Sequence, residues 1–327
     1  MSQSADLDAR RRFLIRVLQL GGASAAAVVS GALLAGRSAR PEDITPVVGG
    51  RDHTVAPNPA LPELVIAQGE SPQALVQRAL LEMGGMGRFV ARGDTVVVKP
   101  NIAWDRAPEQ AATTNPDVVA EVVRQCLAAG AGSVIVTDVS CNDAQTCFER
   151  SGIAAAAKAA GAEVVLPEPR FFTQVDLKGD TLGVWPVLEP FLDAHKLINV
   201  PIAKHHSLTG VTLGMKNWYG LIGGNRSRLH QRIHESLVDL TAFARPTLTI
   251  LDGYRVLMRS GPTGGDLEDV ELKKTLLVST DPVAIDAYAA KAWWNIDVPR
   301  LRFLRLAEAR GLGRSDFAAL RTKVLTV

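Results

Sequence analysis

Residues 199–225 bring together the side chains of this chain that are best suited to chemistry. After an apolar, strand-like run come two lysines, two adjacent histidines and an amide, namely Lys204, His205, His206, Lys216 and Asn217. A purely structural segment would keep one hydrophobic period, whereas cationic and imidazole groups interrupt the pattern here. We therefore expect catalytic or charge-pairing lysines, with His205 or His206 as an acid, a base or a metal ligand. The alternative for the histidines is a solvated pair near a helix start.

Polar side chains also follow the other predicted strands. Lys99 and Asn101 follow one apolar strand, and Asp138, Asp252 and Asp281 stand at the ends of further strands or the starts of helices. Ligands of open parallel sheets bind outside the carboxyl ends of the strands, so these residues are expected to line one crevice. The aspartates have a simpler alternative as turn and capping residues. Lys99 has no capping use there, and we expect it to bind the ligand together with Asn101.

Residues 208–222 can form a helix. That helix would place Thr209, Thr212, Lys216 and Tyr219 along one face at three- and four-residue spacing. Lys216 and Thr212 would then meet an anionic group together, while the apolar side chains of the segment would face the core. Asn217 would help to orient the bound molecule.

His230 and His234 are candidate metal ligands. Spacing of four residues puts two imidazoles on one helix face, which suits a divalent cation. The glutamate of the H-E-x-x-H arrangement is absent, so this is not a zincin signature, although Glu235 can be considered as a third ligand. Packing on a helix surface is the equally weighted alternative.

A glycine-rich loop at residues 261–265 can present backbone N–H groups to an anion, with Gly264 and Gly265 as its candidate binding residues. The loop lacks the G-x-x-x-x-G-K-[ST] pattern, and no G-x-G-x-x-G follows a strand. Neither familiar nucleotide-binding loop is therefore present in the sequence.

The order of the elements predicts the fold. Strands are expected at 63–68, 95–98, 133–137, 163–166, 196–200, 247–251 and 275–279, helices at 72–84, 115–129, 152–160, 227–243, from 281 and at 301–310, and a hairpin or excursion at 167–190. Such alternation is typical of an α/β fold with a mostly parallel sheet and helices on both faces. Two similar lobes, 62–200 and 201–327, with the site between them are one way to arrange these elements.

The first 36 residues resemble a targeting segment. Arg10, Arg11 and Arg12 precede a weakly apolar run rich in Ala and Gly, a pattern typical of a twin-arginine signal. This predicts a periplasmic or exported protein and the twin-arginine export machinery as a partner. An uncleaved membrane anchor is the alternative, because about 20 uncharged residues can span a bilayer. Residues 37–61 show no sustained period and are expected to be a linker.

The charge distribution argues against nucleic acid as a partner. Residues 1–40 hold six arginines and two aspartates, a net of +4, so the other residues sum to −2 in a chain whose formal charge is +2. Binding to a phosphate backbone needs a clustered Lys/Arg face, and the body of the chain shows none in its sequence. Because 47% of the residues of the whole chain are hydrophobic, we expect a globular protein.

The three cysteines limit the expected cofactors. Cys126 falls in a helical pattern and is expected to be buried, while Cys141 and Cys147 lie in a polar segment where an oxidising compartment would permit a disulfide. Three cysteines without a C-x-x-C pair cannot supply a four-thiolate site. We expect no self-contained iron–sulfur cluster, whereas a divalent metal stays open.

Several motifs resemble those of the DUF362 family. They are the segments 96–101 (VVVKPN), 147–148 (CF) with 151–153 (SGI), 204–206 (KHH) through 216–220 (KNWYG), and 281–286 (DPVAID), which together span roughly residues 62–295. The resemblance implies one pocket built from these motifs and does not imply a reaction. Many members of that family look like iron–sulfur proteins because of a fused ferredoxin-type segment with clustered cysteines. This chain lacks such a segment in its sequence.

These patterns favour an exported enzyme that acts on an anionic small molecule, with a metal or cofactor bound in a crevice lined by Lys, His and Asn. A periplasmic protein that captures a ligand or metal without altering it is the first alternative. A redox protein that receives electrons from a partner, with an oxidoreductase role, is the second.

Overall fold

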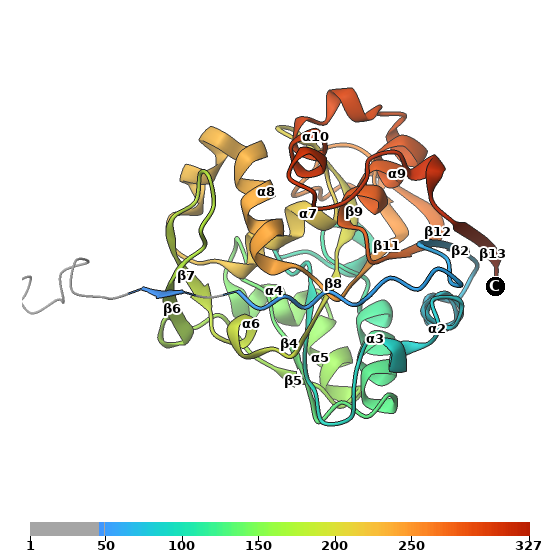
Figure 1. Cartoon of the computed structure of the whole chain (residues 1–327), viewed down its shortest axis with the longest axis horizontal. Helices are drawn as coiled ribbons and strands as arrows, with labels where there is room; N and C mark the ends of the chain where they lie inside the picture. Colours follow the sequence, from blue (N-terminus) through green and yellow to red (C-terminus); the bar gives the residue numbers. More distant parts are fainter. Residues whose placement is uncertain (1–45, 49) are drawn as a thin grey trace, which may run out of the picture. The chain divides into compact units, whose positions relative to one another are not determined.

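The computed structural model describes residues 46–48 and 50–327 (Figure 1). The predicted signal or anchor, residues 1–36, and the first part of the predicted linker lie outside the described residues. Within the described part of the chain, no helix combines the length and apolar character needed to cross a bilayer.

A ten-stranded sheet forms the centre of the described body, in the order β13-β2-β12-β11-β8-β3-β4-β5 with β9 and β10 attached through β11. The pairs β13–β2, β11–β8, β11–β9, β8–β3, β3–β4 and β4–β5 are parallel, whereas β2–β12, β12–β11 and β9–β10 are antiparallel. The strands are β2 (Leu64–Gln68), β3 (Thr95–Pro100), β4 (Ser133–Val136), β5 (Glu163–Val164), β8 (Lys196–Val200), β9 (Ile202–His206), β10 (Gly210–Thr212), β11 (Leu248–Leu257), β12 (Val270–Ser279) and β13 (Thr322–Thr326).

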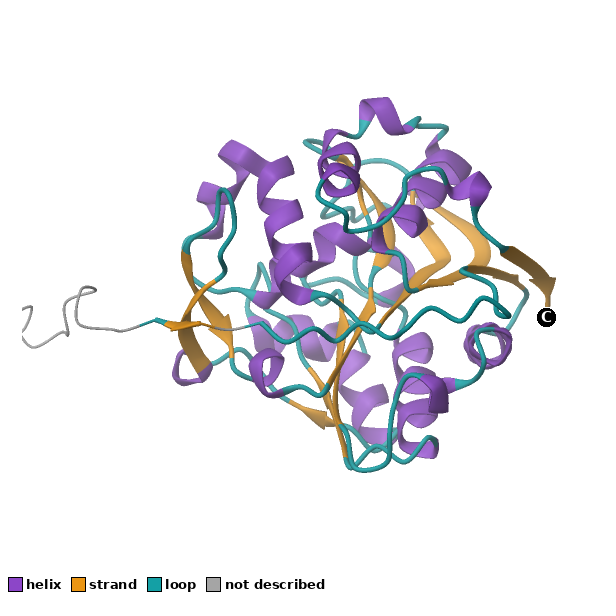
Figure 2. Cartoon of the chain, in the orientation of Figure 1, coloured by secondary structure: helices purple, strands orange, loops and turns teal. Residues whose placement is uncertain are grey.

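Helices cover both faces of this sheet (Figures 1 and 2). They are α2 (Pro72–Glu82), α3 (Pro116–Ala128), α4 (Ala144–Arg150), α5 (Ile153–Ala159), α6 (Pro190–Asp193), α7 (Gly214–Asn217), α8 (Ile233–Ala244), α9 (Pro282–Trp294) and α10 (Arg302–Ala309). In β3, Val96 and Val98 pack in the core that includes α2, α3 and α5, and Val97 packs in the core under α6 and α8. This alternation follows from the two-residue period of a strand, and the predicted α/β class is confirmed.

Most of the predicted elements are present. The run β2, α2, β3, α3, β4, α5, β5 reproduces the expected alternation, and the side chain of Asn115 caps α3 by accepting a hydrogen bond from the backbone N–H of Asp117. The expected hairpin at 167–190 is the antiparallel pair β6 (Phe172–Asp176) and β7 (Val184–Leu188), with β1 (Val47–Val48) parallel to β6 in a separate small sheet.

Strands from the two predicted lobes are hydrogen-bonded to each other. β2, which comes from residues 62–200, lies between β12 and β13, which come from residues 201–327. β8 of the first range likewise pairs with β11 of the second. The sheet is therefore continuous across the predicted boundary at residue 200.

Three local predictions are wrong. Residues 208–222 do not form one helix, because β10 pairs with β9 and α7 begins only at Gly214, after which the 3-10 helix η5 (Trp218–Leu221) follows. His205 and His206 lie in strand β9 and not near a helix start. The helix expected at 227–243 is divided into the 3-10 helix η6 (Arg226–Arg232) and α8.

Candidate functional site

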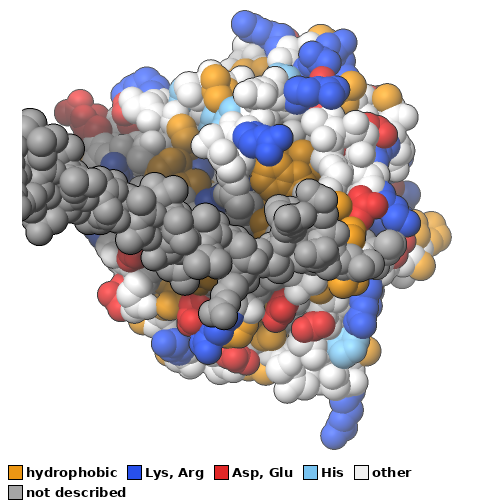
Figure 3. All heavy atoms as spheres, turned by 90° about the vertical axis from the view of Figure 1, so that its left-hand side faces the viewer, with side chains coloured by type: hydrophobic (Ala, Val, Ile, Leu, Met, Phe, Trp, Pro, Cys, Tyr) orange, Lys and Arg blue, Asp and Glu red, His pale blue; other side chains and the backbone are white. Residues whose placement is uncertain are grey.

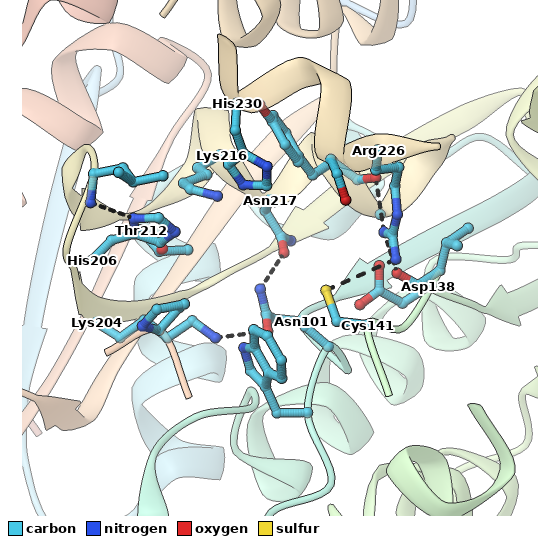
Figure 4. Close-up of a pocket in the computed structure, with 18 of the residues that line it drawn as sticks. Asn101, Asp138, Cys141, Lys204, His206, Thr212, Lys216, Asn217, Arg226 and His230 are labelled. Carbon is cyan, nitrogen blue, oxygen red and sulfur yellow. Dashed lines mark hydrogen bonds between the residues drawn. The ribbon is translucent and has the colours of Figure 1, made fainter. Parts of the chain in front are cut away.

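A cavity of about 510 Å³ is lined by residues at the ends of β3 and β4 and by residues of β9 (Figure 4). The motif predicted to be the centre of the site contributes one wall through β9, β10, α7 and η5. Lys99, Asn101, Asp138, Lys204, His206, Lys216 and Asn217 all line the cavity. The volume falls in the range of small-molecule sites, about 300–1,000 Å³.

Lys99 is fully buried, and its amino group has three acceptors. It donates to Oδ1 of Asp138 at 2.6 Å, to the carbonyl oxygen of Pro100 at 2.7 Å and to Oδ1 of Asn217 at 3.1 Å. Burial lowers the pKa of Lys99, and the carboxylate of Asp138 opposes that shift. An ammonium group has three N–H donors, so Lys99 is fully used inside the protein and serves to fix its neighbours.

Two asparagines connect Lys99 to Lys204 through a series of hydrogen bonds. Oδ1 of Asn217 accepts from Lys99 and also from Nδ2 of Asn101 at 3.0 Å, and Oδ1 of Asn101 accepts from Lys204 at 3.2 Å (Figure 4). Nδ2 of Asn217 donates to Oδ1 of Asn199 at 2.8 Å. The orientation of both amides is thus fixed by Lys99, which can only donate. We predicted that Asn101 and Asn217 orient a ligand, and in the structure their polar atoms position the two lysines.

Lys204 is buried, and no carboxylate within residues 46–48 and 50–327 pairs with it. Besides Asn101, its amino group donates to the carbonyl oxygen of Ala112 at 2.6 Å. Burial lowers the pKa of Lys204 to about 7, and the charge of Lys216 adds to that shift. Near neutral pH this amine is therefore divided between its charged and neutral forms, as suits a group that gives and takes protons.

Lys216 lies on the opposite wall, in α7, with its Nζ 4.5 Å from the centroid of the Tyr219 ring. It has no hydrogen-bond partner among the described residues, and burial lowers its pKa to about 8. Oγ1 of Thr212 and the hydroxyl of Tyr219 are also buried and unpaired within that part of the chain. Although the predicted helix is wrong, Lys216 and Thr212 do line the same cavity, and these groups are free to meet a ligand.

The two histidines have different positions. Nδ1 of His206 accepts from the backbone N–H of Leu208 at 3.1 Å, so its neutral ring carries the proton on Nε2. Burial, then the charge of Lys216, lowers the pKa of His206 to about 3, which keeps the ring neutral. His206 is thus a hydrogen-bond donor toward the cavity. Nδ1 of His205 accepts from the backbone N–H of Gly261 at 3.2 Å, and His205 is not part of the cavity wall.

Arg226 is a cavity residue that the sequence analysis did not identify. Its guanidinium donates to the carbonyl oxygen of Val139 at 2.7 Å and to that of Ser140, and Nη2 lies 3.8 Å from Sγ of Cys141 (Figure 4). These partners are uncharged carbonyls and a thiol. The only signal in the sequence was the position of Arg226 directly after the glycine-rich end of the motif.

The cavity wall is strongly cationic. Among the described residues that line it, the charged ones are Lys99, Lys204, Lys216 and Arg226 against a single carboxylate, Asp138, which is already paired with Lys99. Lys204, Lys216 and Arg226 therefore face the cavity without a carboxylate partner among the described residues. On the uncovered part of the face in Figure 3, basic and acidic side chains are intermixed.

Two features constrain the geometry of the cavity walls: the lack of space for a side chain at position 220 and the hydrogen bonds of Asp286. A Cβ on Gly220 would lie 1.7 Å from Oδ1 of Asp138 and 2.8 Å from Nζ of Lys99, so only glycine fits there. The carboxylate of Asp286 accepts from the backbone N–H groups of Gly214 at 2.7 Å and Met215 at 2.9 Å and so fixes the start of α7. Lys216 follows directly, which makes Asp286 a positioning residue for it.

Besides His205, four residues for which we predicted a place in the crevice or a role in anion binding lie outside the cavity wall. Asp252 is buried and accepts from the backbone N–H groups of Asn115 and Tyr254. Asp281 caps α9 through the backbone N–H groups of Val283 and Ala284. The simpler alternative as turn and capping residues holds for both. Gly264 and Gly265 are also absent from the wall, to which their loop contributes Pro262.

His230 and His234 do not share a helix face as predicted. His230 lies in η6, lines the cavity and packs against the Tyr219 ring at a centroid distance of 5.9 Å. His234 lies in α8 and stacks on Phe303 at 6.2 Å. Among residues 46–48 and 50–327, no group of three or more His, Cys, Asp or Glu side chains is placed to hold a metal ion.

All three cysteines are free thiols in the structure. Cys126 is buried in α3, as expected, and Cys147 is buried in α4, whereas Cys141 is exposed beside the cavity. Burial raises the pKa of Cys126 to about 12 and that of Cys147 to about 11. The disulfide between Cys141 and Cys147 that the sequence permits is not formed here.

The fold and the cavity define an α/β protein with a cation-lined pocket at the ends of its strands. The chain belongs to the DUF362 family, described as a domain of unknown function, because residues 96–291 match the model of that family. The matched range contains every cavity residue discussed above.

A curated relative is the thylakoid-associated protein sll1697 of Synechocystis sp., which is 31% identical over 219 residues. The match covers 64% of this chain and 66% of that protein, so the chain accounts for slightly less than two thirds of the relative.

Two solved structures resemble the described body distantly. The lactate racemase apoprotein of Thermoanaerobacterium thermosaccharolyticum has a TM-score of 0.41 at 12% identity and matches 71% of this chain and 58% of its own. A protein of Thermotoga maritima has a TM-score of 0.37 at 13% identity and matches 73% of this chain and 58% of its own.

Proposed function

We propose that this chain is an enzyme that binds a small organic anion in the cavity and acts on it through Lys204. The observation that carries the proposal is the presence of Lys204, Lys216 and Arg226 around one cavity in which Asp138, the one carboxylate among the described lining residues, is paired with Lys99. Cations that are held away from water without a carboxylate partner attract an anion more strongly than exposed ones do, because the local dielectric constant is low.

The residues have separate tasks in this proposal. Lys216 and Arg226 hold the negative charge of the ligand, since neither is neutralised by a described carboxylate. The Nε2–H of His206 and the hydroxyl of Thr212 donate hydrogen bonds that orient it. Lys204, whose pKa is about 7, exchanges a proton with the bound molecule.

Thermal unfolding of the full chain with added anions tests the binding step. Phosphate, sulfate and oxalate are compared with uncharged molecules of similar size, because a ligand at 100 times its Kd stabilises the folded state by about 2.7 kcal/mol. We expect at least one anion to raise the Tm of the wild type and of Lys158→Met, an exposed lysine in α5, but not that of Lys216→Met. Equal shifts in both variants would refute the assignment.

Turnover separates an enzyme from a protein that only captures the anion. The anions that raise the Tm are incubated with the full chain and followed by mass spectrometry. Conversion that is lost in Lys204→Arg supports catalysis, whereas retention of every bound anion unchanged supports capture.

Export through the twin-arginine pathway is a further proposal, supported by Arg10, Arg11 and Arg12 and the weakly apolar run that follows them. The full chain is produced in a bacterium with and without that export machinery. Delivery to the periplasm only when the machinery is present supports the proposal, and delivery independent of it overturns it.

A further inference from the structure

The three cavity lysines differ in their hydrogen-bond partners. These partners suit different protonation states of the amino groups. Lys99 has three acceptors including a carboxylate, which suits an ammonium ion. Lys216 faces only an aromatic ring among the described residues. Lys204 has two acceptors, Oδ1 of Asn101 and the carbonyl oxygen of Ala112, and both are uncharged.

Two neutral acceptors match the two N–H groups of a neutral amine. Asn101 cannot rotate to offer a donor, because its Nδ2 is held by Asn217, whose own orientation is fixed by Lys99. When both N–H groups of Lys204 are used, the remaining tetrahedral position on Nζ is the nitrogen lone pair. Lys204 is part of the cavity wall, so this lone pair is the part of the group left to meet a ligand (Figure 4).

The surroundings of that amine suit a carbonyl group attached to an anion. The Nε2–H of His206 is available to polarise a carbonyl oxygen, and Lys216 and Arg226 are available to hold a carboxylate. A nucleophile, a donor for the oxygen and a place for the charge are the elements needed for covalent catalysis by lysine.

We propose that Lys204 forms an imine with a small oxo acid, a molecule that carries a carbonyl next to its anionic group. Nζ forms a bond to the carbonyl carbon, the carbon–oxygen bond breaks, and the oxygen leaves as water with the two amine protons. The imine can then take a proton from solvent and donate its N–H to the carbonyl oxygen of Ala112. This inference rests on the proposed function, since it requires an anion in the cavity, and it adds the substrate class and a covalent step.

A large share of Lys204 is a free amine at neutral pH. With a pKa of about 7, about half of Lys204 is neutral at pH 7. An exposed lysine with the usual pKa near 10.4 is neutral in roughly one molecule per few thousand. Lys204 is therefore expected to react with a carbonyl before the exposed lysines do.

Reductive trapping tests the imine. The full chain is treated at pH 7 with glyoxylate and cyanoborohydride, which reduces the imine to a stable carboxymethyl amine, and the modified lysines are mapped by peptide mass spectrometry. We expect the adduct on Lys204 well before any on the exposed Lys158 or Lys323. Glycolate, in which a hydroxyl replaces the carbonyl, is expected to slow that reaction by competition. An adduct that appears first on Lys216, or evenly over exposed lysines, would overturn the inference.

Calorimetry with glycolate and glyoxylate keeps the two proposals apart. If both bind but Lys204 stays unmodified, the imine is refuted and anion binding stands. If neither glycolate nor any other anion binds, the proposed function fails and the imine fails with it.

Lys204→Arg keeps a cation but cannot form an imine. It is therefore expected to bind glycolate within about tenfold of the wild type, a difference of 1.4 kcal/mol, and to give no adduct at residue 204. The mapping on wild type stands even if this variant does not fold.

Discussion

The amino group of Lys99 lies 2.6 Å from Oδ1 of Asp138, and both side chains are almost completely buried. This pair joins the ends of β3 and β4 and begins the series of hydrogen bonds that reaches Lys204 through Asn217 and Asn101. A buried ion pair with these additional hydrogen bonds contributes mainly by fixing geometry. Its role here is to orient the amides that hold Lys204.

Lys99→Met is expected to destabilise the protein strongly. The substitution leaves the carboxylate of Asp138 buried without its cation, which costs about 3–5 kcal/mol in the free energy of unfolding. Urea denaturation of the full chain measures this loss, with Lys323→Met as the matched control because that lysine is exposed on β13. Similar midpoints for the two variants would show that the pair has no such role.

Gly220→Ala is also expected to disturb the ion pair between Lys99 and Asp138. The added Cβ would lie 1.7 Å from Oδ1 of Asp138, so the carboxylate or η5 must move. Overpacking of this kind costs about 1–3 kcal/mol and here should also weaken anion binding. Gly87→Ala is the control, since its Cβ would meet nothing within 4 Å. Wild-type stability and affinity in Gly220→Ala would contradict the geometry.

Anion binding is expected to weaken as the pH rises from 6 to 9. The pKa values of Lys204 and Lys216 are about 7 and about 8, so both lose their positive charge over this range while the anion prefers the charged forms. Each lysine whose pKa the anion raises by one unit contributes up to about tenfold. Calorimetry with oxalate measures the trend, and Lys204→Arg, whose guanidinium stays charged over this range, should show a shallower one. An anion affinity that increases with pH would contradict this prediction.

Thiol labelling is expected to find one reactive cysteine in the native protein. Cys141 is exposed beside the cavity, whereas Cys126 and Cys147 are buried with raised pKa values. A maleimide should label Cys141 alone without denaturant and all three thiols with it, and a bound anion should slow the labelling of Cys141. A protein with a single titratable thiol after denaturation would instead contain a disulfide.

The sequence analysis identified much of the cavity because polar residues that directly follow apolar runs mark the ends of strands. Lys99, Asn101 and Asp138 follow apolar strands, and the parallel arrangement brings them together, as expected. Asp252 and Asp281 have the same signal, but Asp281 caps α9 locally, and Asp252 accepts from the nearby backbone N–H of Tyr254 and the distant one of Asn115. A sequence pattern cannot distinguish these two uses of aspartate.

Other parts of the site depend on contacts between distant segments. Arg226 enters the wall because its guanidinium binds the carbonyl oxygens of Val139 and Ser140, more than 80 residues away. The predicted helix at 208–222 fails because β10 pairs with β9 and Asp286 fixes the start of α7. Such tertiary hydrogen bonds override the local helical period.

The most direct test of the central claim is a crystal structure of the full chain grown with selenate, whose anomalous scattering locates the anion. The cationic cavity predicts a selenate within hydrogen-bond distance of Lys216 or Arg226, and loss of that peak in Lys216→Met crystals. Anomalous peaks confined to the outer surface, with the cavity free of selenate in the wild type, would contradict the account.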